Sequence, residues 1–151
     1  MSQADQAHMR RAIALARPHL GQTAENPSVG CVIVRNGAVV GEGATGLGGR
    51  PHAEEIAVQA AGPAAQGAVV YVTLEPCGAR SSGAPSCAAR LTQAGVAQVV
   101  IACADPSPYA DGQGVGQLRA AGLEVRLGVL AEEAQDLYRG YAPARTRRPG
   151  H

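Results

Sequence analysis

Apolar positions follow two different spacings along the first third of the chain. Residues 5–20 repeat their apolar side chains at helical spacing, which predicts an amphipathic helix that Pro18 weakens near its end. The run VGCVIV at 29–34 is apolar at every position, as is typical of a strand covered on both faces. The dipeptide Asn36-Gly37 separates this run from a second apolar one, and therefore predicts a two-residue β-hairpin.

Beyond the hairpin, predicted helices and strands alternate. We expect helices at residues 52–61, 87–94, 115–121 and 130–139, and strands at 68–74, 96–104 and 123–129. Pro51 and Ser86 suit the starts of the first two of these helices, in the first turn and at the N-cap. Strands that alternate with helices run parallel with right-handed crossovers. The sequence thus predicts an α/β protein, a three-layer α/β/α sandwich around a five-stranded mixed sheet.

Composition narrows the classes of partner. With 151 residues, 46% of them hydrophobic, the chain has room for one compact domain, and its core must do without Phe and Trp. With a net charge of +1 and 3% aromatic residues, the chain has little excess positive charge to bind phosphates and few rings on which bases could stack, so nucleic-acid binding is not expected. No apolar run approaches the ~20 residues that cross a membrane, and no signal peptide is recognisable. We therefore expect a cytoplasmic protein whose thiols are available to a metal.

Three potential metal ligands fall at the ends of predicted elements. His52 and Cys87 begin predicted helices, where free N–H groups favour negative charge and help a thiol to ionise, and Cys77 follows a predicted strand. One histidine and two cysteines leave a tetrahedral zinc ion with one open position, which is typical of a catalytic site. Each residue alone has an ordinary structural explanation, but together they favour zinc. Cys31 and Cys103 lie inside predicted strands, and we assign them to the core.

Glu54 is the candidate for proton transfer. It follows His52 by two residues, about 200° round a helix and only ~3 Å along its axis, so it lies near the metal without being a ligand. That position suits a general base that takes a proton from water and passes it to a substrate nitrogen. Zinc deaminases carry H-x-E followed by P-C-x-x-C. Here H-A-E and P-C are present, but Cys77 and Cys87 are separated by nine residues.

Longer segments resemble the deaminase domain of the riboflavin-biosynthesis deaminase/reductase family. The resemblance covers about residues 7–141 and rests on NPSVGCVIV, PHAE, TLEPC and the loop DPSPYADGQG. It implies a cytidine deaminase-like fold, one zinc ion per chain, and hydrolytic deamination of a diaminopyrimidinone ribosylamino 5′-phosphate. In this resemblance His52, Cys77 and Cys87 correspond to the zinc ligands, and Glu54 corresponds to the proton shuttle.

The same resemblance supplies candidate substrate contacts. Asn26 resembles a residue that contacts the sugar or ring of the substrate, although it equally suits a turn ahead of Pro27. Asp105 resembles part of the loop that lines the same pocket, and Arg80 is the one charged residue between the two cysteines. The remaining candidates are neighbours of the motifs or members of them: Thr45, Arg50, Ala53 and Glu75.

The chain departs from the family pattern where a substrate phosphate would bind. The family usually has C-x-H-x-G-[KR]-T-P-P-C, whereas this chain reads CGARSSGAPSC, with Ala79 in the place of the histidine. Thr45 and Arg50 stand where we expect a histidine and an acidic residue. One charge-assisted contact contributes roughly 1.5–3 kcal/mol, so losing two would change the preferred substrate. The alternatives are a paralogous deaminase of an unphosphorylated pyrimidine, purine or pterin, and a non-catalytic zinc module.

The resemblance also sets expectations for domains and partners. We expect a zinc-dependent deaminase domain over 1–142 and a tail over 143–151 that resembles the linker to a reductase domain absent from this chain. The expected partner is a small heterocyclic amine, most simply a nucleotide. A homodimer is compatible with the family, whereas membranes and nucleic acids are not expected partners.

Overall fold

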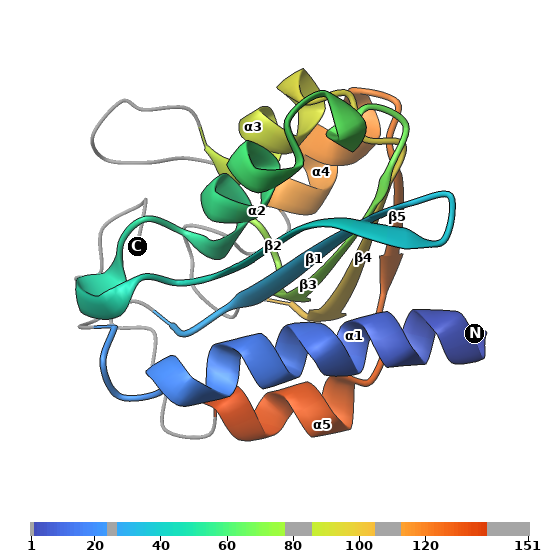
Figure 1. Cartoon of the computed structure of the whole chain (residues 1–151). Coiled ribbons are helices and arrows are strands. Elements are labelled where there is room, and N and C mark those ends of the chain that lie inside the picture. Colours follow the sequence, from blue (N-terminus) through green and yellow to red (C-terminus); the bar gives the residue numbers. More distant parts are fainter. Residues whose placement is uncertain (1, 24–26, 78–85, 105–112, 139–151) are drawn as a thin grey trace.

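A single mixed sheet organises the structure, a computed structural model that describes residues 2–23, 27–77, 86–104 and 113–138 (Figure 1). Its five strands lie in the order β2-β1-β3-β4-β5. They are β1 (Gly30–Arg35), β2 (Ala38–Ala44), β3 (Val69–Leu74), β4 (Gln98–Cys103) and β5 (Glu124–Leu127). Strand β1 runs antiparallel to β2 and β3, and β3, β4 and β5 run parallel. The predicted five-stranded mixed sheet is therefore confirmed.

The predicted hairpin joins β1 to β2. Asn36 and Gly37 have φ angles of 52° and 79°, the left-handed region that a tight two-residue turn requires and that these two residue types tolerate best. The turn pairs Arg35 with Ala38, and every residue of β1 before Arg35 is buried. The dipeptide thus closes the hairpin, and β1 lies in the interior of the sheet because it pairs with β3 on its other side.

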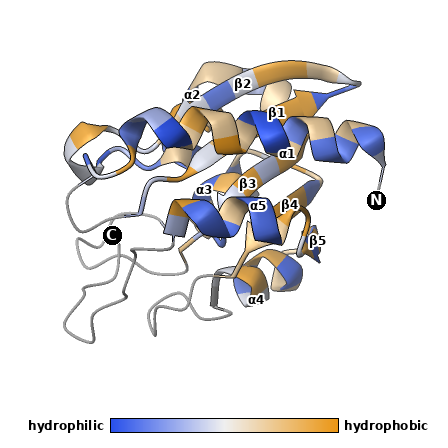
Figure 2. Ribbon diagram, turned by 90° about the horizontal axis from the view of Figure 1, so that it is seen from below, coloured by the Kyte–Doolittle hydropathy of each residue, from blue (hydrophilic) through white to orange (hydrophobic). Residues whose placement is uncertain are grey.

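Helices cover both faces of the sheet, as the sandwich prediction requires. They are α1 (Gln3–Ala16), α2 (Ala53–Ala61), α3 (Cys87–Gln93), α4 (Gln113–Ala120) and α5 (Ala131–Gln135). Figure 1 shows α2, α3 and α4 on one face and α1 and α5 on the other. Figure 2, seen from the side of α1 and α5, shows hydrophilic and hydrophobic residues alternating along α1. The part of α1 that faces the sheet consists of Met9, Ala12, Ile13 and Ala16, which are buried.

Two predicted helices end earlier than their apolar patterns suggest. The first ends at Ala16 and continues as a 3-10 turn over Arg17–His19, because Pro18 has no N–H to donate to the preceding turn. The last is divided into α5 and a 3-10 turn over Asp136–Tyr138. None of the described helices combines the length and the apolar character of a membrane span. The tail at 143–151 lies outside the described residues.

Glycines allow α2 to lie almost in contact with the backbone of β2. A Cβ atom on Gly43 would be 2.5 Å from the carbonyl oxygen of Ala53, and one on Gly41 would be 2.4 Å from that of Ala57. Such distances are too short for any side chain, so only glycine permits this approach. The close packing fixes the start of α2, and with it the candidate residues His52 and Glu54, relative to the sheet.

Asp5 joins the start of α1 to two strands. It forms a capping box with Ser2, whose hydroxyl accepts the Asp5 N–H at 3.1 Å. Its carboxylate also accepts hydrogen bonds from the Tyr71 hydroxyl and from Arg126, the latter at 3.1 Å. The bond from Tyr71, followed by those from Arg126 and Ser2, lowers the pKa of Asp5 to about 2.

Replacing Asp5 should make the free energy of unfolding depend less on pH in the acidic range. The folded pKa of about 2 lies below the ordinary value of 3.8 for an aspartate, so the charged form stabilises the fold above pH 4 and this stabilisation disappears as the pH falls through 2. We expect Asp5→Asn to lower the free energy of unfolding by on the order of 1–2 kcal/mol at pH 6 and by little at pH 2. Urea unfolding across this range measures the difference. The control Glu132→Gln should give the wild-type profile, and a constant deficit for Asp5→Asn at every pH would contradict the assignment.

Candidate metal centre

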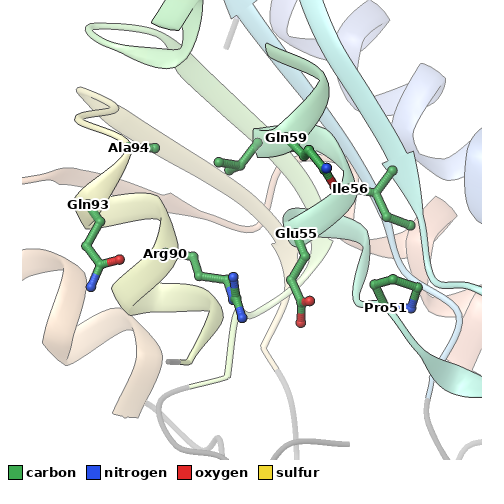
Figure 3. Close-up of a pocket in the computed structure, with 8 residues that line it drawn as sticks. Pro51, Glu55, Ile56, Gln59, Arg90, Gln93 and Ala94 are labelled. Atoms are coloured by element: carbon green, nitrogen blue, oxygen red, sulfur yellow. The ribbon is translucent and has the colours of Figure 1, made fainter. Parts of the chain in front are cut away.

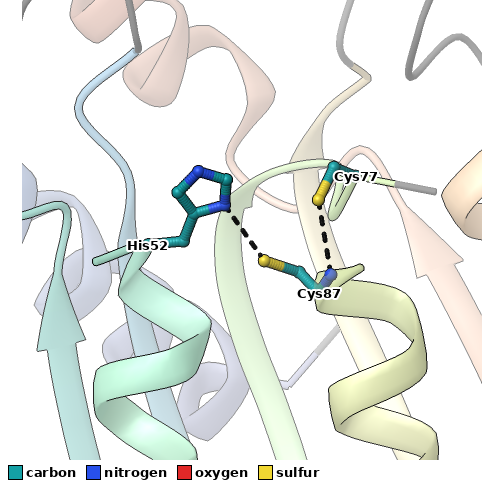
Figure 4. Close-up of side chains that lie close together, drawn as sticks. All are labelled: His52, Cys77 and Cys87. Atoms are coloured by element: carbon teal, nitrogen blue, oxygen red, sulfur yellow. Dashed lines mark hydrogen bonds between the residues drawn. The ribbon is translucent and has the colours of Figure 1, made fainter. Parts of the chain in front are cut away.

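His52, Cys77 and Cys87 meet at one end of the sheet, although they come from three separate segments (Figure 4). His52 is the N-cap residue of α2, Cys87 is the first residue of α3, and Cys77 follows β3 by three residues. All three are buried, and their potential ligand atoms lie within 4.8 Å of one another. Nδ1 of His52 is 3.3 Å from Sγ of Cys87. The structure therefore brings together the three residues that the sequence nominated.

The start of α3 holds Cys77 through backbone bonds. The N–H of Cys87 donates to Sγ of Cys77 at 3.3 Å, and the N–H of Ala88 donates to the carbonyl oxygen of Cys77 at 3.2 Å. Ser86 is the N-cap of α3, as predicted, because its hydroxyl accepts the N–H of Ala89 at 3.1 Å. The two cysteines are consequently held together by the same turn of helix.

The two sulfur atoms differ in their affinity for a proton. The pKa of the Cys77 thiol is lowered, chiefly because the Cys87 side chain hydrogen-bonds to it and also because His52 and the Cys87 N–H do so. The pKa of Cys87 is raised, first by this same bond to Cys77 and then by burial. The pair therefore favours a thiolate at Cys77 that accepts a hydrogen bond from the thiol of Cys87. A cation between the sulfurs would replace that proton and allow both to ionise.

The donor set fits a zinc ion. Donors that share one tetrahedral Zn²⁺, each about 2.0–2.3 Å from it, lie roughly 3.5–4 Å apart, which is close to the spacing in this cluster. Nδ1 of His52 faces the sulfur of Cys87, whereas its Nε2 is buried without a hydrogen-bond partner among the described residues. One nitrogen and two sulfurs leave a fourth position open, as in catalytic zinc sites.

Glu54 lies in the first turn of α2, next to the cluster but outside it. Its side chain is buried, and burial raises its pKa to about 7, with His52 acting to lower it and Cys77 to raise it. A carboxyl group with a pKa near neutrality accepts and releases a proton readily at physiological pH. A cation at the cluster would shift the balance towards the carboxylate.

The other two cysteines contribute to packing. Cys31 in β1 is fully buried, and its pKa is raised by burial and by the proximity of Glu54, so it stays a thiol. Cys103, at the end of β4, is half-buried and donates to the carbonyl oxygen of Ala131 at 3.5 Å. The assignment of Cys31 to the core is confirmed, whereas Cys103 lies at the edge of the core.

Four of the candidate substrate residues lie within the described chain. Thr45, Ala53 and Glu75 are buried, whereas Arg50 is exposed. Asn26, Arg80 and Asp105 lie outside the described residues. Substrate contact by any of the seven stays a prediction.

Threonine hydroxyls fix the chain where it enters β1. The Thr45 hydroxyl accepts the N–H of Val29 at 2.9 Å, and the Thr73 hydroxyl accepts the N–H of Gly30 at 3.1 Å. The carbonyl oxygen of Thr45 is in turn contacted by Nδ1 of His19. Sequence patterns did not predict these roles, because the partners are 16 to 43 positions apart in the chain. Thr45 therefore positions the segment that follows the NPS motif.

A groove of about 430 Å³ separates α2 from α3 on the outer surface. It is lined by Pro51, Glu55, Ile56, Val58, Gln59, Arg90, Gln93 and Ala94. Figure 3 shows the charged ends of Glu55 and Arg90 pointing towards the same space. None of the three clustered donor residues lines this groove. It is thus a second surface feature, formed by the same two helices that carry His52 and Cys87.

The part of the sequence that contains these clustered residues matches a known protein family. Residues 2–103 match the model of the cytidine and deoxycytidylate deaminase zinc-binding region. The matched segment contains the three clustered donors and Glu54.

Individual relatives extend the similarity beyond that region. The chain is 46% identical over 133 residues to the riboflavin biosynthesis protein RibD of Synechocystis, covering 88% of this chain but only 36% of the relative. It is 41% identical to the diaminohydroxyphosphoribosylamino-pyrimidine deaminase of Buchnera aphidicola, covering 91% of this chain and 92% of that protein. Among solved structures, Acinetobacter baumannii RibD superposes with a TM-score of 0.88 at 46% identity, covering 95% of this chain and 40% of that one. The predicted cytidine deaminase-like fold is confirmed.

Proposed function

The chain belongs to the family of deaminases that carry the cytidine and deoxycytidylate deaminase zinc-binding region, and from this we propose that it deaminates a diaminopyrimidinone ribosylamino 5′-phosphate in riboflavin biosynthesis. The observation that carries the proposal is the buried His52, Cys77 and Cys87 cluster with Glu54 beside it. The choice of substrate is supported by similarity over nearly the whole length of the Buchnera deaminase. The chain spans little more than a third of the RibD relatives, so their further activities are not proposed for it.

We assign one zinc ion per chain to His52, Cys77 and Cys87. Bound zinc lowers the pKa of a water molecule and so supplies a nucleophile at neutral pH. The residues of the chain provide the remaining chemistry. His52 and the two cysteines hold the ion at a buried position. Both cysteines must be reduced to bind it, and the predicted cytoplasmic location would keep them reduced.

Glu54 transfers the proton. Its carboxylate accepts a proton from the attacking water and delivers it to the amino group, which leaves as ammonia while the ring carbon becomes a carbonyl carbon. Burial keeps bulk water from exchanging that proton during the step. Because only the carboxylate form accepts a proton, activity should fall as the pH drops below the pKa of Glu54.

A second candidate function follows from the altered sequence between the cysteines. With Ala79 where the family has histidine, and Arg80 as the one charged residue of that loop, fewer groups are available for a phosphate. A paralogue that acts on an unphosphorylated aminated heterocycle would need none of them. The buried metal cluster and Glu54 are equally compatible with both substrates.

A substrate pair separates these two functions. We expect the zinc-loaded protein to release ammonia from the phosphorylated compound with a kcat/KM at least about tenfold above that for its dephosphorylated form, since one charge-assisted phosphate contact contributes roughly 1.5–3 kcal/mol. A coupled ammonia assay measures both rates. Equal rates, or a preference for the dephosphorylated compound, would favour the paralogue, and inertness of folded, zinc-loaded protein towards both would reject the riboflavin-pathway substrate.

Replacing Glu54 tests the catalytic assignment. We expect Glu54→Gln to retain zinc and to lose roughly 10²–10⁴-fold in kcat, because general acid–base catalysis contributes about that much. Metal analysis and the ammonia assay are made on the same sample. A non-catalytic zinc module predicts instead that neither wild type nor variant has activity to compare.

Two cysteine variants are the matched controls. Cys87→Ser should lose both zinc and activity, whereas Cys103→Ser, which changes a half-buried cysteine outside the cluster, should keep both. If Cys87→Ser retained wild-type zinc content, the proposed ligand set would be wrong.

We also propose that two copies associate through the groove between α2 and α3. Glu55 and Arg90 both line this groove. A twofold axis through the groove can therefore place Glu55 of each copy against Arg90 of the other.

Light scattering tests this association. Wild type should have the mass of a dimer, and Arg90→Glu should shift it towards the monomer, because it sets two acidic residues against each other. The exchange of both residues, Glu55→Arg with Arg90→Glu, should restore the dimer. A wild type that stays monomeric at concentrations of tens of micromolar would contradict the proposal.

A further inference from the structure

Helix α4 approaches the loop that carries Cys77 more closely than a side chain would permit. A Cβ atom on Gly114 would lie 1.9 Å from the carbonyl oxygen of Pro76, 3.0 Å from its carbonyl carbon and 3.6 Å from the carbonyl carbon of Cys77. All of these are backbone atoms, which cannot turn away as the end of a flexible side chain can. The bare backbone of Gly114 is therefore packed directly against the peptide unit that precedes a proposed zinc ligand.

The same helix also contacts the residue before the second cysteine. The hydroxyl of Ser86 donates to Oε1 of Gln117 at 3.4 Å, and helices α3 and α4 pack side by side (Figure 1). Gly114 and Gln117 are three residues apart, so they lie on neighbouring positions of one helix face. Helix α4 thus contacts Pro76 and Ser86, each of which immediately precedes a cysteine of the cluster.

Few other described contacts set the distance between the two sulfurs. Cys77 receives N–H groups from Cys87 and Ala88, which tie it to α3. On its sheet side, Glu75 is held by its N–H bond to the carbonyl oxygen of Cys103 at 2.9 Å. The segment between these two anchors is Pro76–Cys77, and Gly114 is packed against it.

We propose that Gly114 is a positioning residue for the metal centre, and that α4 sets the separation of Cys77 and Cys87 by resting on Pro76 and Ser86. This inference rests on the zinc site of the proposed function, but not on its substrate. Adding one methyl group at residue 114 displaces the Pro76 carbonyl, and with it the sulfur of Cys77, from the geometry that a tetrahedral ion requires.

The test compares two glycines of the same helix. Gly114→Ala should lower zinc affinity about tenfold or more, as the loss of outer contacts to metal ligands commonly does. Gly116→Ala should leave it unchanged, because a Cβ atom there meets nothing within 4 Å. Affinity is measured by competition with a chromophoric chelator, and the Co²⁺-substituted proteins supply absorption bands that report the thiolate geometry. We expect altered bands for Gly114→Ala and wild-type bands for Gly116→Ala.

A second variant keeps the test decisive if Gly114→Ala does not fold. Gln117 is exposed, so Gln117→Ala should fold while it removes the hydrogen bond from Ser86. We expect about threefold weaker zinc binding, which is the effect of losing one net hydrogen bond. Wild-type affinity in folded Gly114→Ala, or in Gln117→Ala when the first variant is unfolded, would overturn the inference.

Failure of this inference is distinguishable from failure of the proposed function. A wild type that binds zinc but releases no ammonia contradicts the proposed function alone, and the ratio of affinities between the two glycine variants still decides the role of Gly114. A wild type that binds no zinc overturns both.

Discussion

The structure depends on placing three potential metal ligands, His52, Cys77 and Cys87, together with the carboxyl group of Glu54 in a buried position. Such groups are costly to bury in their charged forms, because the protein interior solvates charge far less well than water. The pKa values of these groups reflect this cost: burial raises the pKa of Glu54 to about 7, and the pKa of Cys87 is raised by its hydrogen bond to Cys77 and by burial. A divalent cation bound by the cluster would compensate the charge of both sulfurs at once, which makes the burial of this donor set consistent with the proposed zinc site.

Small residues make this placement possible. The chain has 20 glycines and no Phe or Trp, and several glycines lie where helix and backbone meet. Gly41 and Gly43 let α2 rest on β2, and Gly114 lets α4 rest on the Cys77 loop. The starts of α2 and α3 consequently converge on one end of the sheet, so His52 and Cys87 face each other although they are 35 positions apart in the chain.

Local signals predicted most of the fold, because each of them acts within a few residues. Asn36-Gly37 predicted the hairpin through its φ preference, Ser86 predicted the start of α3 through its capping hydroxyl, and the alternation of helices and strands predicted the parallel half of the sheet. Long-range contacts were not predictable in this way. Neither the bond from Val29 to Thr45 nor the approach of Gly114 to Pro76 leaves a periodic pattern in the sequence.

In the candidate site, too, some residues were predictable from local sequence signals and others were not. The proposed zinc ligands belong to the first group, and the residues that would select the substrate belong to the second. The proposed zinc ligands and Glu54 are at or near helix starts and the end of a strand, where motif spacing made them recognisable before their geometry was known. Cys77 is held by N–H groups of α3 and by the backbone of α4, contacts that do not depend on which side chains follow it. Changes such as Ala79 and Arg80 can therefore alter substrate recognition while the described contacts to the metal ligands stay the same. The proposed deamination chemistry and the choice of amine are thus separable, and the sequence constrains the first more tightly than the second.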